Sequence, residues 1–280
     1  MFRRFKKYIT RQHLLMKPAP AVTLLLVSAC LWIAAIIPQK PTLYLIGDST
    51  VKNSNDKGEG GMWGWGHFID AYFDTTRINI ENHAIGGRSS RTFLTEGRWE
   101  KIRTTLKPGD FVMMQFGHND ASPINDTLRA RGTIKGIGEE TQEIDNLITK
   151  KHEVVHSYGW YLRKYVTETK ARGAIPIVLS LVPRNGWRDG KVVRGADNYG
   201  KWASEVAKSE TDGKLKTYFI DLNEIVARKY DVVGDSALLQ ATYFVKDNVH
   251  TNAAGAKLNA AAVVDGLKQL KSCPLNLYVK

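Results

Sequence analysis

Residues 42–50 read Thr-Leu-Tyr-Leu-Ile-Gly-Asp-Ser-Thr, an apolar run that leads directly into a small polar turn. Uninterrupted apolar residues are typical of a strand buried on both faces of a parallel sheet, so we predict a strand from Thr42 to Ile46. Gly47 permits a tight exit that would place the Ser49 hydroxyl at the carboxyl edge of the sheet, where open α/β sheets bind ligands. Ser49 is therefore a candidate nucleophile. A serine that only caps a following helix fits the same tripeptide equally well.

Strand-like and helix-like stretches alternate through the rest of the chain, which is the pattern of an α/β domain. The five predicted strands, taken as parallel, are Thr42 to Ile46, Arg77 to Asn82, Asp110 to Phe116, Ala174 to Leu181 and Thr217 to Asp221. The predicted helices are Trp65 to Phe73, Gly97 to Thr105, Glu153 to Arg172, Tyr199 to Ser209, Asn223 to Tyr230 and Ala253 to Leu270. Residues 121–150 interrupt the alternation, and we interpret them as a long loop beside the functional site. We expect one domain over residues 39–280, preceded by a separate segment, 1–38.

The N-terminal segment has the features of an export signal. Six of its residues are basic and none is acidic, and a nearly unbroken apolar run from Ala21 to Ile37 follows the basic part. The run fits a cleaved signal, an uncleaved membrane anchor or, through Cys30, a bacterial lipoprotein site. In each case residues 40–280 would lie in the periplasm or outside the cell, with membrane contact through this segment alone. If the segment is removed or modified, Cys273 alone remains, without a partner for an intramolecular disulfide.

The charge of the chain narrows the class of partner. The net charge is +12 and the first 38 residues contribute +6, so the remainder carries 12 − 6 = +6. A basic surplus favours an anionic polysaccharide, a nucleic acid or a membrane surface. No basic block interleaved with aromatic residues occurs outside the N-terminal segment, so we do not expect nucleic-acid binding.

Asp247 and His250 are the candidate activators of Ser49. A serine hydroxyl is a weak nucleophile at its ordinary pKa, so it needs a general base and a carboxylate that orients that base. Asp and His three residues apart can supply both groups. A solvated Asp beside a helix-capping His is the alternative for this segment.

Two further segments supply donors for an oxyanion. Paired glycines at 86 and 87 follow the second predicted strand, and the backbone N–H of Gly87 could approach a developing negative charge. Asn119 follows the third strand and offers a side-chain amide. Glycine pairs and asparagines at strand ends are usually only turns. A nucleophile, two donors and an Asp–His pair at one sheet edge form a combination that turns alone do not explain.

These four segments, in this order, resemble the four sequence blocks of the SGNH (GDSL-like) hydrolase superfamily, named for Ser, Gly, Asn and His. Further similarity to rhamnogalacturonan acetylesterases lies in Trp63-Gly64-Trp65-Gly66, in residues 84–91 and 116–120, and in the loop stretches 132–134, 138–141 and 183–185. The resemblance implies a three-layer α/β/α, flavodoxin-like fold with a five-stranded parallel sheet. It also implies removal of acetyl groups from pectic rhamnogalacturonan, with acetylated xylan as the alternative. The implied catalytic groups are Ser49, Asp247 and His250, with an oxyanion hole of the Ser49 and Gly87 N–H groups and the Asn119 amide, and without a metal or organic cofactor.

A competing motif occurs at residues 152–156, His-Glu-Val-Val-His, which matches the H-E-x-x-H zinc-protease pattern. On the predicted helix, a spacing of four places both histidines on one face. The third histidine of the extended motif is missing, because Leu162 stands in its position. An ordinary amphipathic helix start explains the segment equally well. The G-x-S-x-G elbow of α/β-hydrolases does not occur in the chain.

Basic and aromatic residues near the predicted site suggest the kind of substrate. Arg88, Arg91, Arg184 and Arg188 could pair with the carboxylates of an acidic plant polysaccharide, and Trp63 could stack on a sugar ring. Solvated loop charges and buried aromatics are the alternatives. Together these residues favour an acetylated acidic polysaccharide over neutral xylan. The competing functional class is a carbohydrate-binding protein without catalytic activity. Such a protein differs from an esterase because it would bind the polysaccharide without turning it over.

Overall fold

Five parallel strands form the centre of the computed structural model, which describes residues 40–52, 58–195, 198–211 and 215–280. They are β1 (Thr42–Gly47), β2 (Asn79–Asn82), β3 (Phe111–Gln115), β6 (Ile175–Leu179) and β9 (Tyr218–Ile220), in the order β2-β1-β3-β6-β9. The strand order reverses between β1 and β3, and ligands bind at such a switch point in open α/β sheets. The predicted five-stranded parallel sheet is confirmed.

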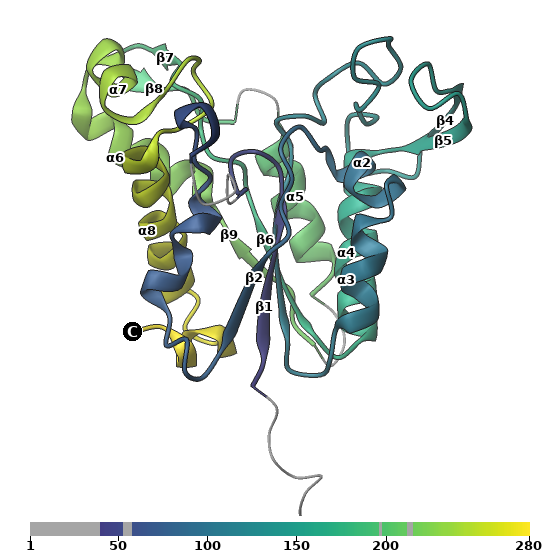
Figure 1. Ribbon diagram of the computed structural model, residues 1–280, viewed down its shortest axis with the longest axis horizontal. Coiled ribbons are helices and arrows are strands. Elements are labelled where there is room, and N and C mark those ends of the chain that lie inside the picture. Colours follow the sequence, from purple (N-terminus) through teal and green to yellow (C-terminus); the bar gives the residue numbers. More distant parts are fainter. Residues whose placement is uncertain (1–39, 53–57, 196–197, 212–214) are drawn as a thin grey trace, which may run out of the picture. The chain divides into compact units, whose positions relative to one another are not determined.

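Two layers of helices cover the sheet. One face carries α2 (Ser90–Thr95), α3 (Arg98–Thr105), α4 (Tyr158–Ala171) and α5 (Tyr199–Ser209), as Figure 1 shows. The other face carries α6 (Leu222–Val233), α8 (Ala253–Gln269) and the short 3-10 helices η3 (Trp65–His67), η4 (Ile69–Tyr72) and η5 (Pro274–Tyr278). Two further short helices, η2 (Glu59–Gly61) and α7 (Ser236–Tyr243), lie in loops. The result is the predicted three-layer arrangement.

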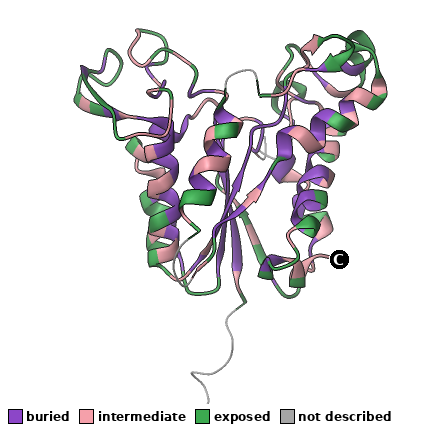
Figure 2. Ribbon diagram, turned by 180° about the vertical axis from the view of Figure 1, so that it is seen from behind, coloured by how far each residue is buried: buried purple, intermediate pink, exposed green. Residues whose placement is uncertain are grey.

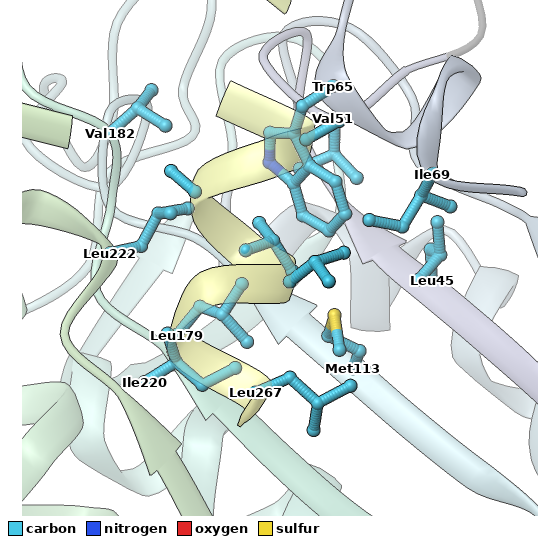
Figure 3. Close-up of a cluster of buried hydrophobic side chains, with 14 of the residues drawn as sticks. Leu45, Val51, Trp65, Ile69, Met113, Leu179, Val182, Ile220, Leu222 and Leu267 are labelled. Atoms are coloured by element: carbon cyan, nitrogen blue, oxygen red, sulfur yellow. The ribbon is translucent and has the colours of Figure 1, made fainter. Parts of the chain in front are cut away.

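Alternation along each central strand divides the core in two. Leu43 and Leu45 of β1 face the α8 layer, whereas Tyr44 and Ile46 face the α4 layer. Figure 2 shows that the central strands are buried along their length. On the α8 side, Figure 3 shows Met113 of β3, Leu179 of β6 and Ile220 of β9 gathered near Leu267 of α8. Burial on both faces explains why these strands appear in the sequence as continuous apolar runs.

Four sequence expectations differ from the observed elements. The predicted helix from Trp65 to Phe73 is two short 3-10 turns, η3 and η4. The long helix begins at Tyr158, capped by Ser157, and the preceding residues form strand β5 (His152–His156). Strand β5 pairs antiparallel with β4 (Thr141–Asp145), so part of the expected loop 121–150 is a hairpin. Helices α2 and α7 and a second small pair, β7 (Trp187–Arg188) with β8 (Lys191–Val192), were not predicted.

The described domain runs from Lys40 to Lys280. The expected signal or anchor at residues 21–37 and the lipoprotein site at Cys30 lie outside the described residues. None of the helices in the described ranges is both long enough and apolar enough to cross a membrane.

Candidate active site

A tight turn after β1 presents Ser49 at the carboxyl edge of the sheet. The turn requires glycine at position 47, because a Cβ there would lie 2.7 Å from both the carbonyl oxygen of Gln115 and a methyl group of Val51. The buried carboxylate of Asp48 accepts hydrogen bonds from the backbone N–H of Thr50 at 2.9 Å and from its hydroxyl at 2.8 Å. An Asp that binds the main chain two residues ahead fixes the turn locally.

A buried polar chain ties this turn to the neighbouring strand. The Gln115 amide nitrogen donates to the Thr50 hydroxyl at 2.5 Å, and its oxygen accepts a hydrogen bond from the indole of Trp65 at 2.9 Å. All three side chains are buried. Buried polar groups that satisfy one another hold a single arrangement. These hydrogen bonds therefore hold the turn that contains Ser49 in one conformation.

His250 lies beside Ser49 although 201 residues separate them in the sequence. Its Nε2 atom is 2.9 Å from the Ser49 Oγ atom, and its Nδ1 atom is 2.8 Å from Oδ2 of Asp247. Oδ1 of Asp247 accepts the backbone N–H groups of His250 at 2.8 Å and of Val249 at 2.9 Å. These are the distances that an activated serine requires between nucleophile, base and orienting carboxylate.

The surroundings of Asp247 keep it ionised. Partial burial acts to raise its pKa, but the hydrogen bonds from the His250 main chain and imidazole and from Val249 N–H outweigh it. The pKa of Asp247 is lowered to about 2 as a result. A carboxylate that stays charged holds the Nδ1–H tautomer of the imidazole and leaves Nε2 free to accept a proton.

The Gly86–Gly87 turn lies beside Ser49, and Asn119 binds the residue that follows this turn, Arg88. The chain leaving β2 continues beside β1, with Ile85 N–H donating to Gly47 O at 3.0 Å, so the glycine turn lies against Ser49. A Cβ placed on Gly86 would be 3.7 Å from Cβ of Ser49, and Gly87 has a φ of 78°, a left-handed conformation suited to glycine. The buried Asn119 donates one amide hydrogen to Arg88 O at 2.9 Å, so its second hydrogen remains for another acceptor.

Arg131 is a residue of this site that the sequence interpretation did not identify. Its Nη1 atom donates to the carbonyl of Gly87 at 2.8 Å, and its Nε atom donates to the Ser122 hydroxyl at 3.0 Å. Segment 121–150 therefore does lie beside the site, as predicted. Arg131 and Gly87 are 44 residues apart and belong to no common motif, so only the fold reveals the contact.

Two of the arginines predicted to bind substrate form ion pairs with glutamates of the protein. The Arg91 side chain is fully buried and pairs with Glu153 through two hydrogen bonds of 2.7 and 2.6 Å. It also donates to the carbonyls of Ile124 and Gly132 at 2.7 and 2.9 Å. The prediction for Arg91 is therefore wrong: its guanidinium holds the loop and hairpin against α2 and is closed to a polysaccharide. Arg88 is partly exposed but pairs with Glu96 at 3.0 Å.

The other predicted binding residues differ in exposure: the two arginines are exposed, whereas the ring of Trp63 packs against His67 and Phe68, with ring centroids 4.5 and 5.4 Å apart. Arg184 and Arg188 are exposed and line a cavity of about 300 Å³ that also contains Asn248, next to Asp247. Trp63 is half-buried, and its backbone carbonyl accepts a hydrogen bond from the hydroxyl of Thr251 at 2.9 Å, next to His250. Figure 1 shows β7–β8 and β4–β5 at the same end of the sheet, on opposite sides.

The H-E-x-x-H segment does not form the helical zinc motif. Residues 152–156 are strand β5, so the spacing that would place two histidines on one helical face does not apply. Glu153 binds Arg91, and the His156 ring stacks on Trp160 at 3.7 Å with an angle of 7° between the rings. Across the described ranges, no cluster of three or more His, Cys, Asp or Glu side chains is arranged to hold a metal ion.

Comparison with known proteins agrees with this geometry. Residues 45–258 match the model of the GDSL-like lipase/acylhydrolase family, which includes the turn with Ser49 and the segment with His250. The chain belongs to this family. The prediction of an SGNH-type esterase is thereby confirmed, and so is the fold that the resemblance implied.

Relatives within the family include named acetylesterases. The chain is 29% identical over 221 residues to the rhamnogalacturonan acetylesterase of Emericella nidulans, a match that covers 79% of this chain and 82% of that protein. It is 30% identical over 233 residues to the probable rhamnogalacturonan acetylesterase YesY of Bacillus subtilis, covering 81% and 93%.

Solved structures support the fold. Protein YxiM of Bacillus subtilis superposes with a TM-score of 0.66 at 26% identity, covering 84% of this chain and 58% of that one. The acetylxylan esterase Axe2 of Geobacillus stearothermophilus superposes with a TM-score of 0.54 at 21% identity, covering 81% and 94%. At that level of identity the second comparison speaks for the shared fold alone.

Proposed function

We propose that this protein is a serine esterase that removes acetyl groups from a plant cell-wall polysaccharide, with rhamnogalacturonan as the substrate. The observation that carries the proposal is the chain of contacts from Ser49 Oγ to His250 Nε2 at 2.9 Å and from His250 Nδ1 to Asp247 at 2.8 Å. These three residues lie at the switch point of the sheet, beside the Gly87 turn and Asn119. Family membership and relatives of about 30% identity that are named for this substrate support it.

Acylation begins when the Ser49 hydroxyl attacks the carbonyl carbon of the acetyl ester. His250 accepts the hydroxyl proton at Nε2, and Asp247 stabilises the imidazolium that forms. The imidazolium then donates this proton to the sugar oxygen as the ester bond breaks. The products of this half-reaction are the deacetylated sugar and an acetyl group on Ser49.

An oxyanion forms during the attack and must be stabilised where it develops. The backbone N–H groups of Ser49 and Gly87 and the free amide hydrogen of Asn119 are the donors that we assign to it. Removal of one donor of this kind raises the barrier by about 3 kcal/mol, roughly a hundredfold in rate. We therefore expect Asn119→Ala to act on kcat more than on KM.

Water completes the reaction. His250 takes a proton from a water molecule that attacks the acetyl-enzyme, and then returns a proton to Ser49 as acetate leaves. These steps use only groups of the protein and water.

The choice of polysaccharide is tested by acetate release from acetylated rhamnogalacturonan, xylan and homogalacturonan. We expect the highest kcat/KM on rhamnogalacturonan and none with Ser49→Ala, which should retain its fold by circular dichroism. A preference for neutral xylan would contradict the substrate assignment. If the parent protein binds the polysaccharide without releasing acetate, and Ser49→Ala binds it equally well, the result would favour a carbohydrate-binding role.

A second experiment separates serine chemistry from zinc chemistry. A serine-directed fluorophosphonate should label Ser49 and abolish activity, whereas a strong chelator should leave activity in place. Loss of activity with the chelator and persistence after the fluorophosphonate would overturn the proposed mechanism.

Export is the remaining part of the proposal. The basic and apolar residues 1–38 support a location outside the cytoplasm, where a polysaccharide substrate is accessible. Cell fractionation of the full chain, with and without residues 1–38, tests this. Recovery of both forms in the cytoplasm would contradict it.

A further inference from the structure

The loop that carries the base and its carboxylate, residues 245–250, lies at the surface of the protein. An isolated bridge between Phe244 and Thr251 closes its base. At its tip Asp247 and Asn248 are exposed, and the side chain of Asp247 is 49% exposed. Exposed loops with few buried contacts open more easily than the elements they connect. The position of Asp247 therefore depends on what holds the tip of the loop.

In the part of the chain that the structure describes, two hydrogen bonds reach this tip from outside the loop. The side-chain amide of Gln240, on α7, donates to the carbonyl of Asp247 at 3.1 Å. The backbone N–H of Asn185 donates to the carbonyl of Asn248 at 2.8 Å. Asn185 belongs to the segment that follows β6, so two separate elements hold the tip.

The side chain of Asn185 joins these two supports. Its amide nitrogen donates to the side-chain oxygen of Gln240 at 2.9 Å and to the carbonyl of Ser236 at 3.0 Å. Its oxygen accepts the indole N–H of Trp187 at 2.8 Å, and because an indole can only donate, this contact fixes which way the Asn185 amide points. The oxygen of Gln240 is thereby engaged, and its NH₂ group is directed at the carbonyl of Asp247.

Asn185 faces α7, whereas its sequence neighbours face a cavity. Arg184, Gly186 and Arg188 line the cavity of about 300 Å³ that also contains Asn248, and Asn185 is not among the described residues of that lining. In Figure 1, α7 lies beside the β7–β8 pair that follows Asn185. An effect of Asn185 on the reaction would therefore pass through the loop and not through contact with the substrate.

The segment that carries Asn185 is itself fixed to the sheet. Leu181 follows β6 and is buried, and its carbonyl accepts the side-chain amide of Asn223 at 3.0 Å. The backbone N–H of Val193 donates to the carbonyl of Gly186 at 2.8 Å, which closes the segment after Asn185. The support is therefore continuous from the central sheet to the tip of the loop.

We propose that Asn185 is a positioning residue for Asp247 and His250. By holding both Gln240 and the carbonyl of Asn248, it keeps the tip where Oδ2 of Asp247 lies 2.8 Å from the imidazole Nδ1. The inference rests on the proposed esterase function and adds a residue outside the reacting groups on which that function depends. A displacement of about 1 Å at a catalytic group is enough to lower a rate by about a hundredfold.

Kinetics of two variants test the proposal. Asn185→Ala removes the three hydrogen bonds of the side chain and leaves the backbone N–H in place. We expect kcat on an acetyl ester to fall about tenfold while KM changes by less than about twofold. Gln240→Met keeps the side-chain length and a good helix former but loses the donor to Asp247, so it should show the same pattern even if the alanine variant fails to fold.

A double substitution shows whether the loss passes through Asp247. In the Asp247→Asn protein the orienting carboxylate is already missing, so adding Asn185→Ala should lower kcat by less than about twofold. Independent, multiplicative losses would overturn the proposal, because they would place the effect of Asn185 elsewhere.

Asn276 provides a matched control. Its amide nitrogen also donates to two acceptors, the carbonyls of Leu267 and Leu270, at 3.1 and 2.9 Å. These contacts lie at the carboxyl end of α8, a helix that begins beside the catalytic loop and runs away from it (Figure 1). Asn276→Ala should lower the unfolding temperature by a similar amount but leave kcat unchanged. An equal fall in kcat would mean that lost stability, and not lost position, lowers the rate.

Proton NMR separates this inference from the function on which it rests. The proton between His250 Nδ1 and Asp247 lies in a charge-assisted hydrogen bond, so it should resonate far downfield of other N–H protons. We expect this resonance in the parent and in Asn276→Ala, and its broadening or loss in Asn185→Ala. A parent that shows the resonance but releases no acetate from any ester would contradict the proposed function. An active parent whose resonance and kcat both survive Asn185→Ala would leave the function standing and overturn the positioning role.

Discussion

Asp247 holds His250 at two points, by accepting its backbone N–H at 2.8 Å and by facing its imidazole Nδ1 at 2.8 Å. Asn at position 247 could present an amide hydrogen to Nδ1 and stabilise the tautomer that cannot accept the serine proton. We predict that Asp247→Asn lowers kcat by roughly 10³–10⁴-fold with little change in the unfolding temperature. Steady-state kinetics with an acetyl ester measures the effect. A loss smaller than tenfold would show that the carboxylate does not orient the base.

Arg131 supports the Gly87 turn through its hydrogen bond of 2.8 Å to the Gly87 carbonyl. Arg131→Gln removes this charge-assisted bond, so the oxyanion donor loses a fixed position, and kcat should fall about tenfold while KM changes little. The control is Arg129→Gln, which removes an exposed charge from the same loop. Equal kinetics in the two variants would exclude a positioning role for Arg131.

Glu153 neutralises the buried guanidinium of Arg91. Glu153→Ala leaves that charge without its partner, so we predict a loss of about 3 kcal/mol in the free energy of unfolding. Glu143→Ala on the same hairpin, where the side chain is 75% exposed, should change it by less than about 0.5 kcal/mol. Urea denaturation measures both. Similar midpoints for the two variants would mean that the buried pair contributes nothing specific.

Asp120 is fully buried next to Asn119, and its stability contribution should depend on pH. Burial raises its pKa from 3.8 to about 7, the charge of Asp48 adds to this, and hydrogen bonds from Ser90 oppose it. Between about pH 4 and 7 the folded protein therefore binds a proton that the unfolded chain has released, and stability should fall as the pH rises through this range.

Asp120→Asn removes this titration while keeping an oxygen that can accept from Ser90. The free energy of unfolding of the variant, measured by urea denaturation at pH 5, 6, 7 and 8, should decline less steeply with pH than that of the parent. Parallel curves for the two proteins would refute the assignment.

The central strands could be predicted because burial on both faces leaves a continuous apolar signal in the sequence. Helix α5 was predicted with its observed ends, Tyr199 and Ser209, for a related reason: one face is buried and the other solvated. Strands β4 and β5 each bury a single residue, so no periodic signal marks them. Their pairing depends on contacts that span the hairpin.

Short helices escaped prediction because their signals lie in the caps. Helix α2 has six residues and begins with a capping box between Ser89 and Thr92, a pattern that could have indicated it. Helix α7 begins after Asp235, whose side chain accepts the N–H of Leu238.

The site itself was predicted unevenly. Ser49, Gly87, Asn119, Asp247 and His250 follow strands or lie in short motifs, so their meeting at one edge could be inferred from topology. Arg91 and Arg131 belong to the same class of basic loop residues in the sequence. Their opposite placements, one buried with Glu153 and one at the Gly87 turn, depend on packing between distant segments.

Both ends of the described domain lie away from the reacting groups. Lys40 precedes β1, and the backbone N–H of Lys280 donates to the carbonyl of Tyr72 at 2.9 Å, at the end of the sheet opposite Ser49 (Figure 1). A linker fused after Lys280 would therefore immobilise the enzyme on a solid support with its catalytic edge directed outward. In this orientation the immobilised enzyme could act on a polysaccharide that is too large to reach a catalytic edge facing the support.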